Sequence, residues 1–412
     1  LLEKHTVEYF ASCPTGLEEI LATELLNQGV AAVNPQKGGV AFTTDDALVA
    51  LKVILHSRTA SRVFKLLYSF ECHNEKSMYQ ELADIKWKSL MDVFQTFRLT
   101  TIYGKLPQDR EVFTNSQFTN LKAKDAIVDW FNHNHNRRPS VDKDHPDVSY
   151  LIRVDDALEG LYKVQLMLDL CGNPLSNRGY RRAPTEAPVR ENLAAGILML
   201  LGWDAKTEGL VDGMCGSGTF LIEGALIAGN ISPQFLKLKD WKKNMRPWAF
   251  LSNQWFTRDL RLVDGFKDLA EATLKSDAEN LKALIAAKPT LTGSDIDDRV
   301  LACTKENLRV AGMSDLVPVF QSSALSIPAP TQKTLFICNP PYGERLQHGE
   351  EDALKELYHG MGENWKKNWK GHRAAVLTGN LPLLKSISLR SSRRLSLYNG
   401  DIECRVAEYQ LF

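Results

Sequence analysis

Four consecutive residues, Asn339, Pro340, Pro341 and Tyr342, carry the clearest chemical signal in the sequence, and they follow an apolar run at residues 335–338. An amine attached to an aromatic ring is a poor nucleophile, because its lone pair is delocalised into the ring. The side-chain carbonyl of Asn339 and the main-chain carbonyl of Pro340 can each accept one N–H bond of such an amine, and the prolines fix φ so that both acceptors are placed beforehand. Tyr342 supplies a ring on which a planar base can stack. These catalytic candidates predict methylation of an exocyclic amine; the alternative is a Pro-Pro turn that closes a strand.

A glycine-rich loop predicts where the methyl donor binds. An apolar run ends at Asp212, residues 213–218 read Gly-Met-Cys-Gly-Ser-Gly, and Thr219 opens a helical pattern. Glycine removes the Cβ atoms that would block close approach, and a helix N-terminus supplies free N–H groups. The spacing matches neither the dinucleotide motif nor a phosphate-binding P-loop, so an ordinary tight turn is the alternative. The candidate donor-binding residues here are Asp212, Gly213, Cys215, Gly216, Gly218 and Thr219.

A second acidic strand end strengthens the donor site. Residues 291–297 read Leu-Thr-Gly-Ser-Asp-Ile-Asp after a long helical stretch. A carboxylate in this position can accept both hydroxyls of a ribose, so Asp295 is the predicted ribose ligand. Asp297 is a lesser candidate and is better placed to cap the next helix. The glycine loop, Asp295 and Asn339 all follow strands, so we expect them along one edge of a parallel sheet, where open α/β folds bind ligands.

On these motifs, residues from about 179 to 412 resemble a class I (Rossmann-like) methyltransferase that uses S-adenosylmethionine, an α/β fold with a parallel sheet and a terminal antiparallel hairpin. The segments 177–181, 187–195, 339–346 and 399–405 sharpen the resemblance. With them, essentially the whole chain is similar to the THUMP-domain methyltransferases that modify guanine N2 in large-subunit (23S) ribosomal RNA. In enterobacteria this unit is the amino-terminal half of a fused two-enzyme chain.

The resemblance implies further roles for individual residues. S-adenosylmethionine is the implied cofactor, with Glu191 near its methionine end and Asn339 also in contact with it. Where the family commonly has an aspartate for the adenine amine, this chain has only serines, and Ser323 is expected to take over that hydrogen bond. Cys215 is not expected to act as a nucleophile, because amine methylation requires no covalent intermediate.

The resemblance also divides the chain into three domains, an α+β ferredoxin-like domain at 1–68, a THUMP RNA-binding domain at 69–172 and the catalytic domain at 173–412. A length of 412 residues agrees with two or three domains. Period-two patterns predict a hairpin within residues 150–170, and Asn399 with Gly400 predicts a second hairpin turn near the end. Three tryptophans, Trp241, Trp248 and Trp255, fall in an insertion that we expect to pack on the core rather than to form a base-stacking lid.

Composition limits the partners. The longest apolar run is far shorter than the roughly 18 residues of a membrane span, and the seven cysteines are spread without a C-x-x-C pair. We therefore expect a cytoplasmic protein without structural metal or disulfides. The formal net charge is zero, so RNA-binding charge must be local. The predicted RNA contacts, which mix cations with an aromatic, are Arg178, Tyr180, Arg181 and Arg182.

The expected partner is large-subunit ribosomal RNA or an assembly intermediate that contains it, and the oligomeric state is left open. Three alternatives stay open at this point. The same motif serves the N6 amine of adenine in RNA or DNA, and a guanine N2 in tRNA would need the same acceptors. A non-catalytic RNA-binding factor for ribosome assembly is the reading from a different functional class.

Overall fold

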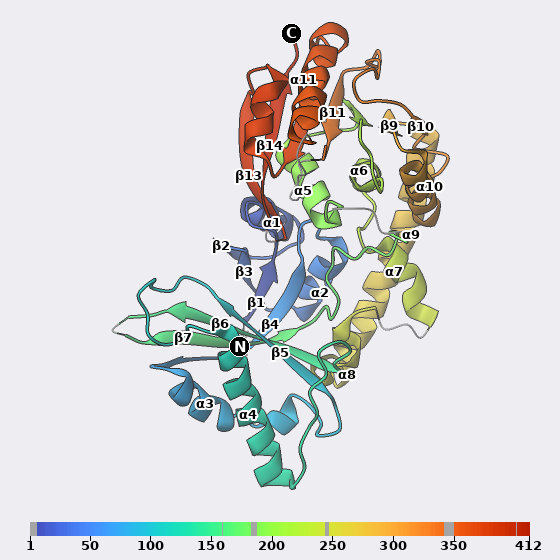
Figure 1. Cartoon of the computed structure of the whole chain (residues 1–412). Coiled ribbons are helices and arrows are strands. Elements are labelled where there is room, and N and C mark those ends of the chain that lie inside the picture. The colour runs from blue at the N-terminus through green and yellow to red at the C-terminus, as the bar shows by residue number, and fades with distance from the viewer. Residues whose placement is uncertain (1–5, 159, 183–187, 244–246, 342–349, 401) are drawn as a thin grey trace.

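The structure is a computed structural model, and it describes residues 6–158, 160–182, 188–243, 247–341, 350–400 and 402–412. Within these residues the chain builds two seven-stranded sheets, one from the amino-terminal part and one from the carboxy-terminal part. Figure 1 shows the carboxy-terminal sheet with its helices at one end of an elongated molecule and the helices α3 and α4 at the other. None of the described helices is long and apolar enough to cross a membrane.

The first sheet has the order β2-β3-β1-β4-β7-β6-β5. Its strands are β1 (Val7–Ser12), β2 (Ala32–Gln36), β3 (Gly39–Thr44), β4 (Arg62–Cys72), β5 (Phe97–Tyr103), β6 (Val148–Asp156) and β7 (Tyr162–Asp169). All neighbours pair antiparallel except β5 and β6. The predicted hairpin at 150–170 is confirmed as β6 and β7. The long strand β4 pairs with β1 on one side and β7 on the other, so one continuous sheet crosses the expected boundary at residue 68.

Helices cover one face of this sheet. They are α1 (Glu18–Asn27), α2 (Ala47–His56), α3 (Glu75–Ala83), the 3₁₀ turn η1 (Trp87–Ser89) and α4 (Ser116–His135). Successive strand residues point to opposite faces. Tyr9 and Ala11 of β1 therefore join the main core with the helices, whereas Phe10 packs with Phe64 and Met167 in a small cluster on the other face.

The second sheet has the order β10-β9-β8-β11-β12-β14-β13. Its strands are β8 (Gly209–Asp212), β9 (Leu291–Asp295), β10 (Val319–Gln321), β11 (Thr334–Cys338), β12 (Arg373–Thr378), β13 (Arg393–Asn399) and β14 (Ile402–Gln410). The first five in this order are parallel, and β14 runs antiparallel to both β12 and β13. Asn399 pairs with Ile402 across the predicted turn. The predicted α/β fold, a parallel sheet that ends in an antiparallel hairpin, is therefore confirmed.

Helices lie on both faces of the second sheet, as a parallel sheet requires. The helices grouped around this sheet are α5 (Glu191–Leu200), α6 (Thr219–Ala228), α10 (Asp298–Ala311), α11 (Glu350–Asn368) and η4 (Leu381–Ile387). Between α6 and β9 the chain forms α7 (Phe235–Asp240), η2 (Trp241–Lys243), η3 (Ala249–Ser252), α8 (Gln254–Thr257) and α9 (Leu260–Ala287). This segment extends to the first sheet, where α9 packs against α2 and the Phe250 N–H of η3 donates to the Leu170 carbonyl (Figure 1). The strand β11 shows the two layers. Its Leu335 and Ile337 pack in the cluster that contains α5 and α6, whereas Phe336 packs against Trp365 and Trp369 of the opposite layer.

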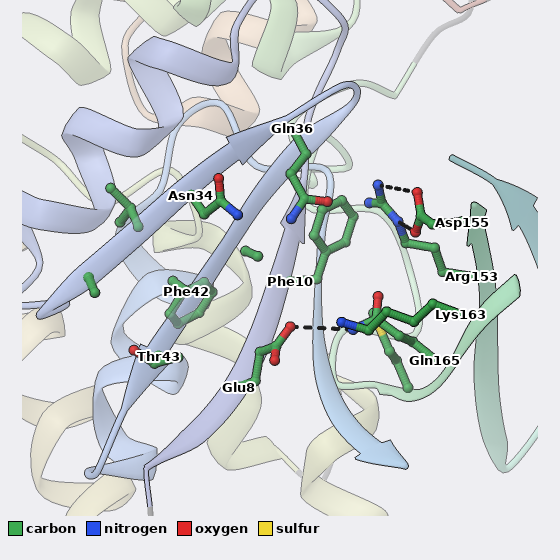
Figure 2. Close-up of a pocket in the computed structure, with 14 residues that line it drawn as sticks. Glu8, Phe10, Asn34, Gln36, Phe42, Thr43, Arg153, Asp155, Lys163 and Gln165 are labelled. Atoms are coloured by element: carbon green, nitrogen blue, oxygen red, sulfur yellow. Dashed lines mark hydrogen bonds and ion pairs between the residues drawn. The ribbon is translucent and has the colours of Figure 1, made fainter. Parts of the chain in front are cut away.

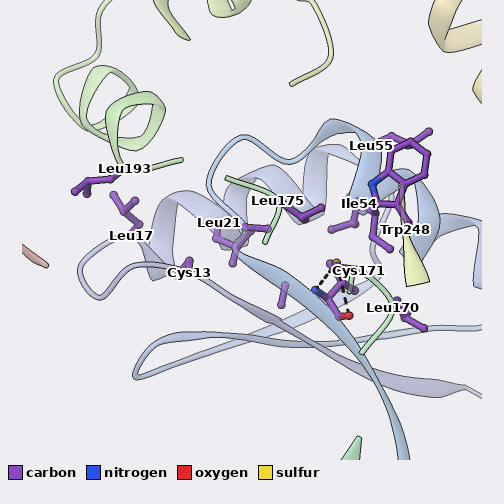
Figure 3. Packing of buried hydrophobic residues seen from close by; sticks show 14 of the residues in the cluster. Cys13, Leu17, Leu21, Ile54, Leu55, Leu170, Cys171, Leu175, Leu193 and Trp248 are labelled. Atoms are coloured by element: carbon purple, nitrogen blue, oxygen red, sulfur yellow. Dashed lines mark hydrogen bonds between the residues drawn. The ribbon is translucent and has the colours of Figure 1, made fainter. Parts of the chain in front are cut away.

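The two sheets share one hydrophobic core. In Figure 3, Leu17 at the start of α1 faces Leu193 of α5, and Trp248 lies beside Ile54 and Leu55 of α2. The α1–α5 approach is close, because a Cβ at Gly196 would lie 2.4 Å from Leu17 Cδ1. The insertion tryptophans mostly pack, as expected. Trp248 is buried, Trp241 lies edge-on to Phe266 with ring centroids 5.6 Å apart, and Trp255 keeps part of its ring exposed.

Candidate active site

Three strand ends meet at one edge of the second sheet. In the parallel pairing, Ile337 of β11 lies beside Asp212 of β8, and Asp212 lies beside Gly293 of β9. Asn339 follows Ile337 by two residues and Asp295 follows Gly293 by two residues. The register therefore brings Asp212, Asp295 and Asn339 to the same carboxyl edge, as the order of the motifs predicted.

The glycine loop between β8 and α6 leaves no room for side chains at two positions. A Cβ at Gly213 would lie 2.1 Å from Phe336 Cζ, and a Cβ at Gly218 would lie 2.8 Å from Thr304 Cγ2. Gly218 also has φ +79°, a left-handed conformation that favours glycine. The loop thus requires glycine for packing as well as for backbone conformation.

Side chains of helix α10 hold this loop in place by hydrogen bonds to its backbone. The sequence alone did not predict this contact. The Thr304 hydroxyl donates a short hydrogen bond to the carbonyl oxygen of Gly216, and Asn307 Nδ2 donates to the carbonyl oxygen of Ser217 at 2.9 Å. Both side chains are fully buried. With these two carbonyls held by α10, the orientation of the loop peptides is fixed. The sequence signal for this contact was the presence of two polar residues, Thr304 and Asn307, on the face of the helix that is otherwise apolar and buried.

Asp295 and Asp297 have separate roles. Asp295 Oδ2 accepts the Gly216 N–H at 3.1 Å, and its Oδ1 accepts the Asp297 N–H at 3.1 Å. Asp297 is the N-cap of α10, where Oδ1 accepts the Arg299 N–H at 2.8 Å. The carboxylate of Asp295 therefore faces the glycine loop, and that of Asp297 serves the helix. Ile296 between them is 70% exposed, an apolar surface at the edge of the site that the sequence reasoning did not single out.

Asp212 is enclosed by the sheet and the loop. Its side chain is 1% exposed, and Oδ1 accepts the Met214 N–H at 3.2 Å. Burial raises the pKa of Asp212 to about 8, and the nearby charge of Asp295 acts in the same direction. At neutral pH the Asp212 carboxyl is therefore mostly protonated in this structure.

Asn339 presents an unsatisfied acceptor. Its Oδ1 is buried, and among the described residues it has no hydrogen-bond partner. Pro340 is buried and Pro341 is exposed. A buried carbonyl without a donor costs about 1–3 kcal/mol, so this oxygen is suited to receive an N–H group from outside the chain. Tyr342 lies outside the described residues.

The remaining donor-site candidates lie around the loop. Cys215 is buried, and burial raises the pKa of its thiol far above the usual range, which agrees with its expected inertness as a nucleophile. Ser323 lies half-buried after β10, where its Oγ accepts the Leu325 N–H at 3.3 Å. Among the described residues, no cluster of histidine, cysteine and carboxylate side chains is arranged to hold a metal ion.

The predicted RNA-contact cluster is divided by the structure. Arg178 and Tyr180 are buried, and both reach Glu223 of α6: Arg178 Nε lies 3.5 Å from Glu223 Oε1, and the Tyr180 hydroxyl donates to the same oxygen at 3.0 Å. This corrects the expectation that Arg178 and Tyr180 contact RNA, because both side chains are buried and already bound to Glu223. Arg182 is exposed, as an RNA contact requires, and Arg181 turns toward Glu191.

A separate cavity of about 440 Å³ lies on the open face of the first sheet (Figure 2). Arg153 Nε binds Asp155 Oδ2 there at 2.7 Å, and the guanidinium carbon lies 4.9 Å from the ring centre of Phe10. Across the cavity, Gln165 Nε2 donates to Glu8 Oε1 at 3.4 Å. None of the residues predicted for donor or amine binding lines this cavity.

Comparison with known proteins agrees with this geometry. Residues 178–408 match the family described as RMKL-like, methyltransferase domain; residues 8–64 match the RlmL ferredoxin-like domain and residues 72–162 the THUMP domain. The chain is 33% identical to the ribosomal RNA large subunit methyltransferase K/L of Aeromonas hydrophila and 34% identical to that of Syntrophotalea carbinolica, over 98% of this chain in each case. It spans only 54% of the length of either relative.

Solved structures show the same architecture. The putative methyltransferase SMU.472, complexed with SAH, is 26% identical with a TM-score of 0.76 over 99% of this chain and 98% of that one. A possible methylase from Clostridium difficile 630 is 25% identical with a TM-score of 0.76 over 99% of each chain. Because the methyltransferase match covers more than half of the 412 residues, and the ferredoxin-like and THUMP matches precede it, this chain belongs to the RMKL-like methyltransferase family.

Proposed function

We propose that this chain transfers a methyl group from S-adenosylmethionine to the exocyclic N2 amine of a guanine in large-subunit ribosomal RNA. The observation that carries the proposal is the buried Oδ1 of Asn339 at the carboxyl edge of β11, which has no partner within the described part of the chain. The substrate class is supported by the names of the relatives that align with nearly the whole of this chain. With ribosomal RNA as substrate, the cytoplasm is the proposed compartment.

The residues around the glycine loop fit the donor. Gly213 and Gly218 leave the loop bare where a Cβ would clash, and α6 begins directly after it. Asp295, whose Oδ2 accepts the Gly216 N–H of the loop, is proposed to accept the ribose hydroxyls, and Ser323 to face the adenine amine. The bound cofactor would supply an activated sulfonium methyl group. Alignment and fixed polar contacts are then sufficient for transfer, without a covalent intermediate on the protein. As the N–C bond forms and the S–C bond breaks, S-adenosylhomocysteine is the leaving group, and the surplus proton of the methylated amine passes to water.

The acceptor amine is proposed to be held by two carbonyls. Asn339 Oδ1 accepts one N–H and the Pro340 carbonyl the other, so that the nitrogen lone pair turns out of conjugation and toward the methyl group. Because Asn339 Oδ1 already lacks a partner among the described residues, it does not have to break an existing bond when the amine arrives. Tyr342 is proposed to stack on the base. The guanine must leave its stack to enter, which costs a few kcal/mol and least in single strands and loops.

Nucleoside mass spectrometry tests the proposal directly. Unmodified large-subunit ribosomal RNA is incubated with the protein and S-adenosylmethionine, digested and analysed. N2-methylguanosine is the expected product. N6-methyladenosine would instead assign the site to the adenine amine, which the same two acceptors can hold. No methylated nucleoside in ribosomal RNA, with product formed on tRNA, would move the substrate to tRNA, and donor binding without product on any RNA or DNA would favour a non-catalytic assembly factor.

A further inference from the structure

An ion pair borders the glycine loop on the side of helix α5. Arg181 Nε lies 3.1 Å from Oε1 of Glu191, the first residue of α5. Arg181 Nη2 also donates to the Thr219 hydroxyl at 3.1 Å and to the Val189 carbonyl at 2.9 Å. Since Thr219 is the first residue of α6, the pair lies where the amino ends of two helices and the glycine loop converge.

This ion pair is enclosed but still reachable. The side chains of Arg181 and Glu191 are 19% and 11% exposed. The hydrogen bonds of the pair use Nε and Nη2 of Arg181 and Oε1 of Glu191. Thr219 extends the polar surface, because its hydroxyl lies 3.0 Å from Ser217 Oγ within the loop. The site therefore presents a guanidinium and a carboxylate, each partly exposed, beside a bare glycine loop.

The arrangement matches an amino-acid zwitterion. A carboxylate satisfies a guanidinium, and an ammonium satisfies a carboxylate, so a zwitterion laid against an Arg–Glu pair meets opposite charges at both ends. The N–H groups at the start of α6 add to the attraction for the anionic end. RNA phosphate fits poorly here, since a phosphate near Arg181 would also meet the carboxylate of Glu191.

We propose that Arg181 binds the carboxylate of the methyl donor and Glu191 its ammonium group, so that the pair anchors the amino-acid end of the molecule. This assigns Arg181 to the donor rather than to RNA. The inference rests on the proposed donor site, which places the adenosine end near Asp295. The inference predicts that the protein binds S-adenosylmethionine more tightly than its decarboxylated form, although the two differ only in the carboxylate.

Calorimetric titration with four ligands tests this selectivity. S-adenosylmethionine and S-adenosylhomocysteine carry the full zwitterion, decarboxylated S-adenosylmethionine keeps only the ammonium, and 5′-methylthioadenosine has neither. Hydrogen bonds to charged groups contribute about 1.5–3 kcal/mol each, and about 1.4 kcal/mol of binding free energy changes the dissociation constant tenfold. The wild-type protein is therefore expected to bind S-adenosylmethionine roughly 10- to 100-fold more tightly than its decarboxylated form.

Three variants separate binding from folding. Arg181→Gln is expected to abolish the preference for the carboxylate while the affinity for 5′-methylthioadenosine changes less than about twofold. Glu191→Gln is expected to weaken binding of the three ligands that carry an ammonium group and again to spare 5′-methylthioadenosine. Arg182→Gln is the matched control, because its side chain is exposed, and it should leave all four affinities unchanged.

The outcomes that would overturn the inference are distinct. A wild-type protein that binds both forms of S-adenosylmethionine equally well contradicts it without any variant. If Arg181→Gln weakens 5′-methylthioadenosine as much as S-adenosylmethionine, the ion pair only supports the loop and the assignment is wrong. Should the wild-type protein bind none of the four ligands, the proposed donor site itself fails along with the inference.

Discussion

At the scale of single residues, the edge of the second sheet separates three tasks. Asn339 has a buried acceptor oxygen with no partner in the described ranges, Asp295 faces the glycine loop, and Asp212 is buried between them. Each side chain follows directly from the end of a different parallel strand, so the backbone register fixes their relative positions. The site is preorganised because none of the three depends on a long flexible side chain.

Two neighbouring aspartates provide a matched test of the ribose assignment. Asp295→Ala is expected to weaken S-adenosylhomocysteine binding by roughly 10- to 100-fold, because hydrogen bonds to a charged carboxylate are lost. Asp297→Ala removes the N-cap of α10 and an exposed ion pair with Arg299, and it should cost about 1 kcal/mol of stability with donor affinity within about twofold. Calorimetry and thermal unfolding measure both effects. Equal affinities for the two variants would place the ribose ligand elsewhere.

The raised pKa of Asp212 predicts a dependence of stability on pH. The folded-state pKa is about 8, whereas an aspartate in an unfolded chain titrates near 4. Between these values the folded protein keeps a proton that the unfolded chain releases. The contribution of Asp212 to stability is therefore full below about pH 4 and is lost as pH rises through 8, by at most about 1.4 kcal/mol per pH unit.

Asp212→Asn removes this titration, since asparagine stays neutral. The unfolding free energy of the variant should exceed that of the wild type by an amount that grows between pH 5 and 8 and levels off above 8. Urea unfolding at a series of pH values measures the difference. A difference that stays constant over this range would mean that Asp212 is not protonated in the folded protein.

At the scale of elements, the proposed donor site depends on a contact between helix α10 and the glycine loop. Thr304 and Asn307 bind successive loop carbonyls, and the Thr304 methyl group lies where a side chain at Gly218 would be. The strand–loop–helix motif could be predicted from sequence because its glycines, apolar strand and helical start are adjacent in the chain. The hydrogen bonds from α10 to the loop could not be predicted, because Thr304 is distant from the loop in sequence and resembles an ordinary helix residue.

Two glycines with positive φ distinguish backbone strain from loop disruption. Gly218→Ala places a Cβ 2.8 Å from Thr304, whereas at Gly202, with φ +62°, a Cβ would meet nothing within 4 Å. Both substitutions should cost about 1–3 kcal/mol of stability through the left-handed conformation. Only Gly218→Ala is expected to weaken S-adenosylhomocysteine binding as well, by roughly tenfold or more, as measured by calorimetry. Similar affinities in the two variants would show that α10 does not set the loop conformation.

At the scale of the whole molecule, buried polar groups join the amino-terminal unit to the catalytic one. Arg178 donates to the Arg58 carbonyl of the segment before β4 and contacts Glu223 of α6, the helix that follows the donor loop. Asn192 of α5 donates to the Thr59 carbonyl at 3.2 Å and to Ser61 Oγ at 2.9 Å. These contacts tie the first sheet to the two helices that border the donor site.

The buried pair predicts unequal effects for two nearby arginines. Arg178→Met removes the guanidinium that lies against the buried carboxylate of Glu223 and leaves only the charge of Arg58 beside it. Removing one partner of a buried pair typically costs about 3–5 kcal/mol. Arg182→Met changes an exposed side chain and should stay within about 0.5 kcal/mol. Urea unfolding compares the two. A small effect of Arg178→Met would mean that the interface does not depend on this pair.

Features that depend on residues close together in the sequence were predicted correctly, whereas features that depend on contacts between distant segments were not. The hairpin of β6 and β7, the parallel sheet and the site residues at strand ends were predictable, because alternation and motif order are written locally in the chain. The destination of Arg178 and Tyr180 was not, since an Arg-Gly-Tyr-Arg-Arg segment reads as a basic surface until Glu223 is brought to it by folding. A charged side chain can be buried only where a partner of opposite charge is available, and for Arg178 that partner is Glu223 of α6, which is distant in sequence.

The central claim, that Asn339 holds the acceptor amine, is tested most directly by single-turnover methyl transfer to large-subunit ribosomal RNA with Asn339→Ala and Asn339→Asp, each paired with a calorimetric affinity for S-adenosylhomocysteine. Loss of one preorganised contact at the reacting group typically costs about 10²- to 10³-fold in rate. Asn339→Ala should lose that much while it still binds the donor, because Asn339 is only one of several residues expected to contact the donor. Asn339→Asp, which keeps an acceptor oxygen, should retain more of the rate. An Asn339→Ala protein that transfers methyl groups at the wild-type rate, or that loses rate and donor affinity in equal measure, would contradict the account.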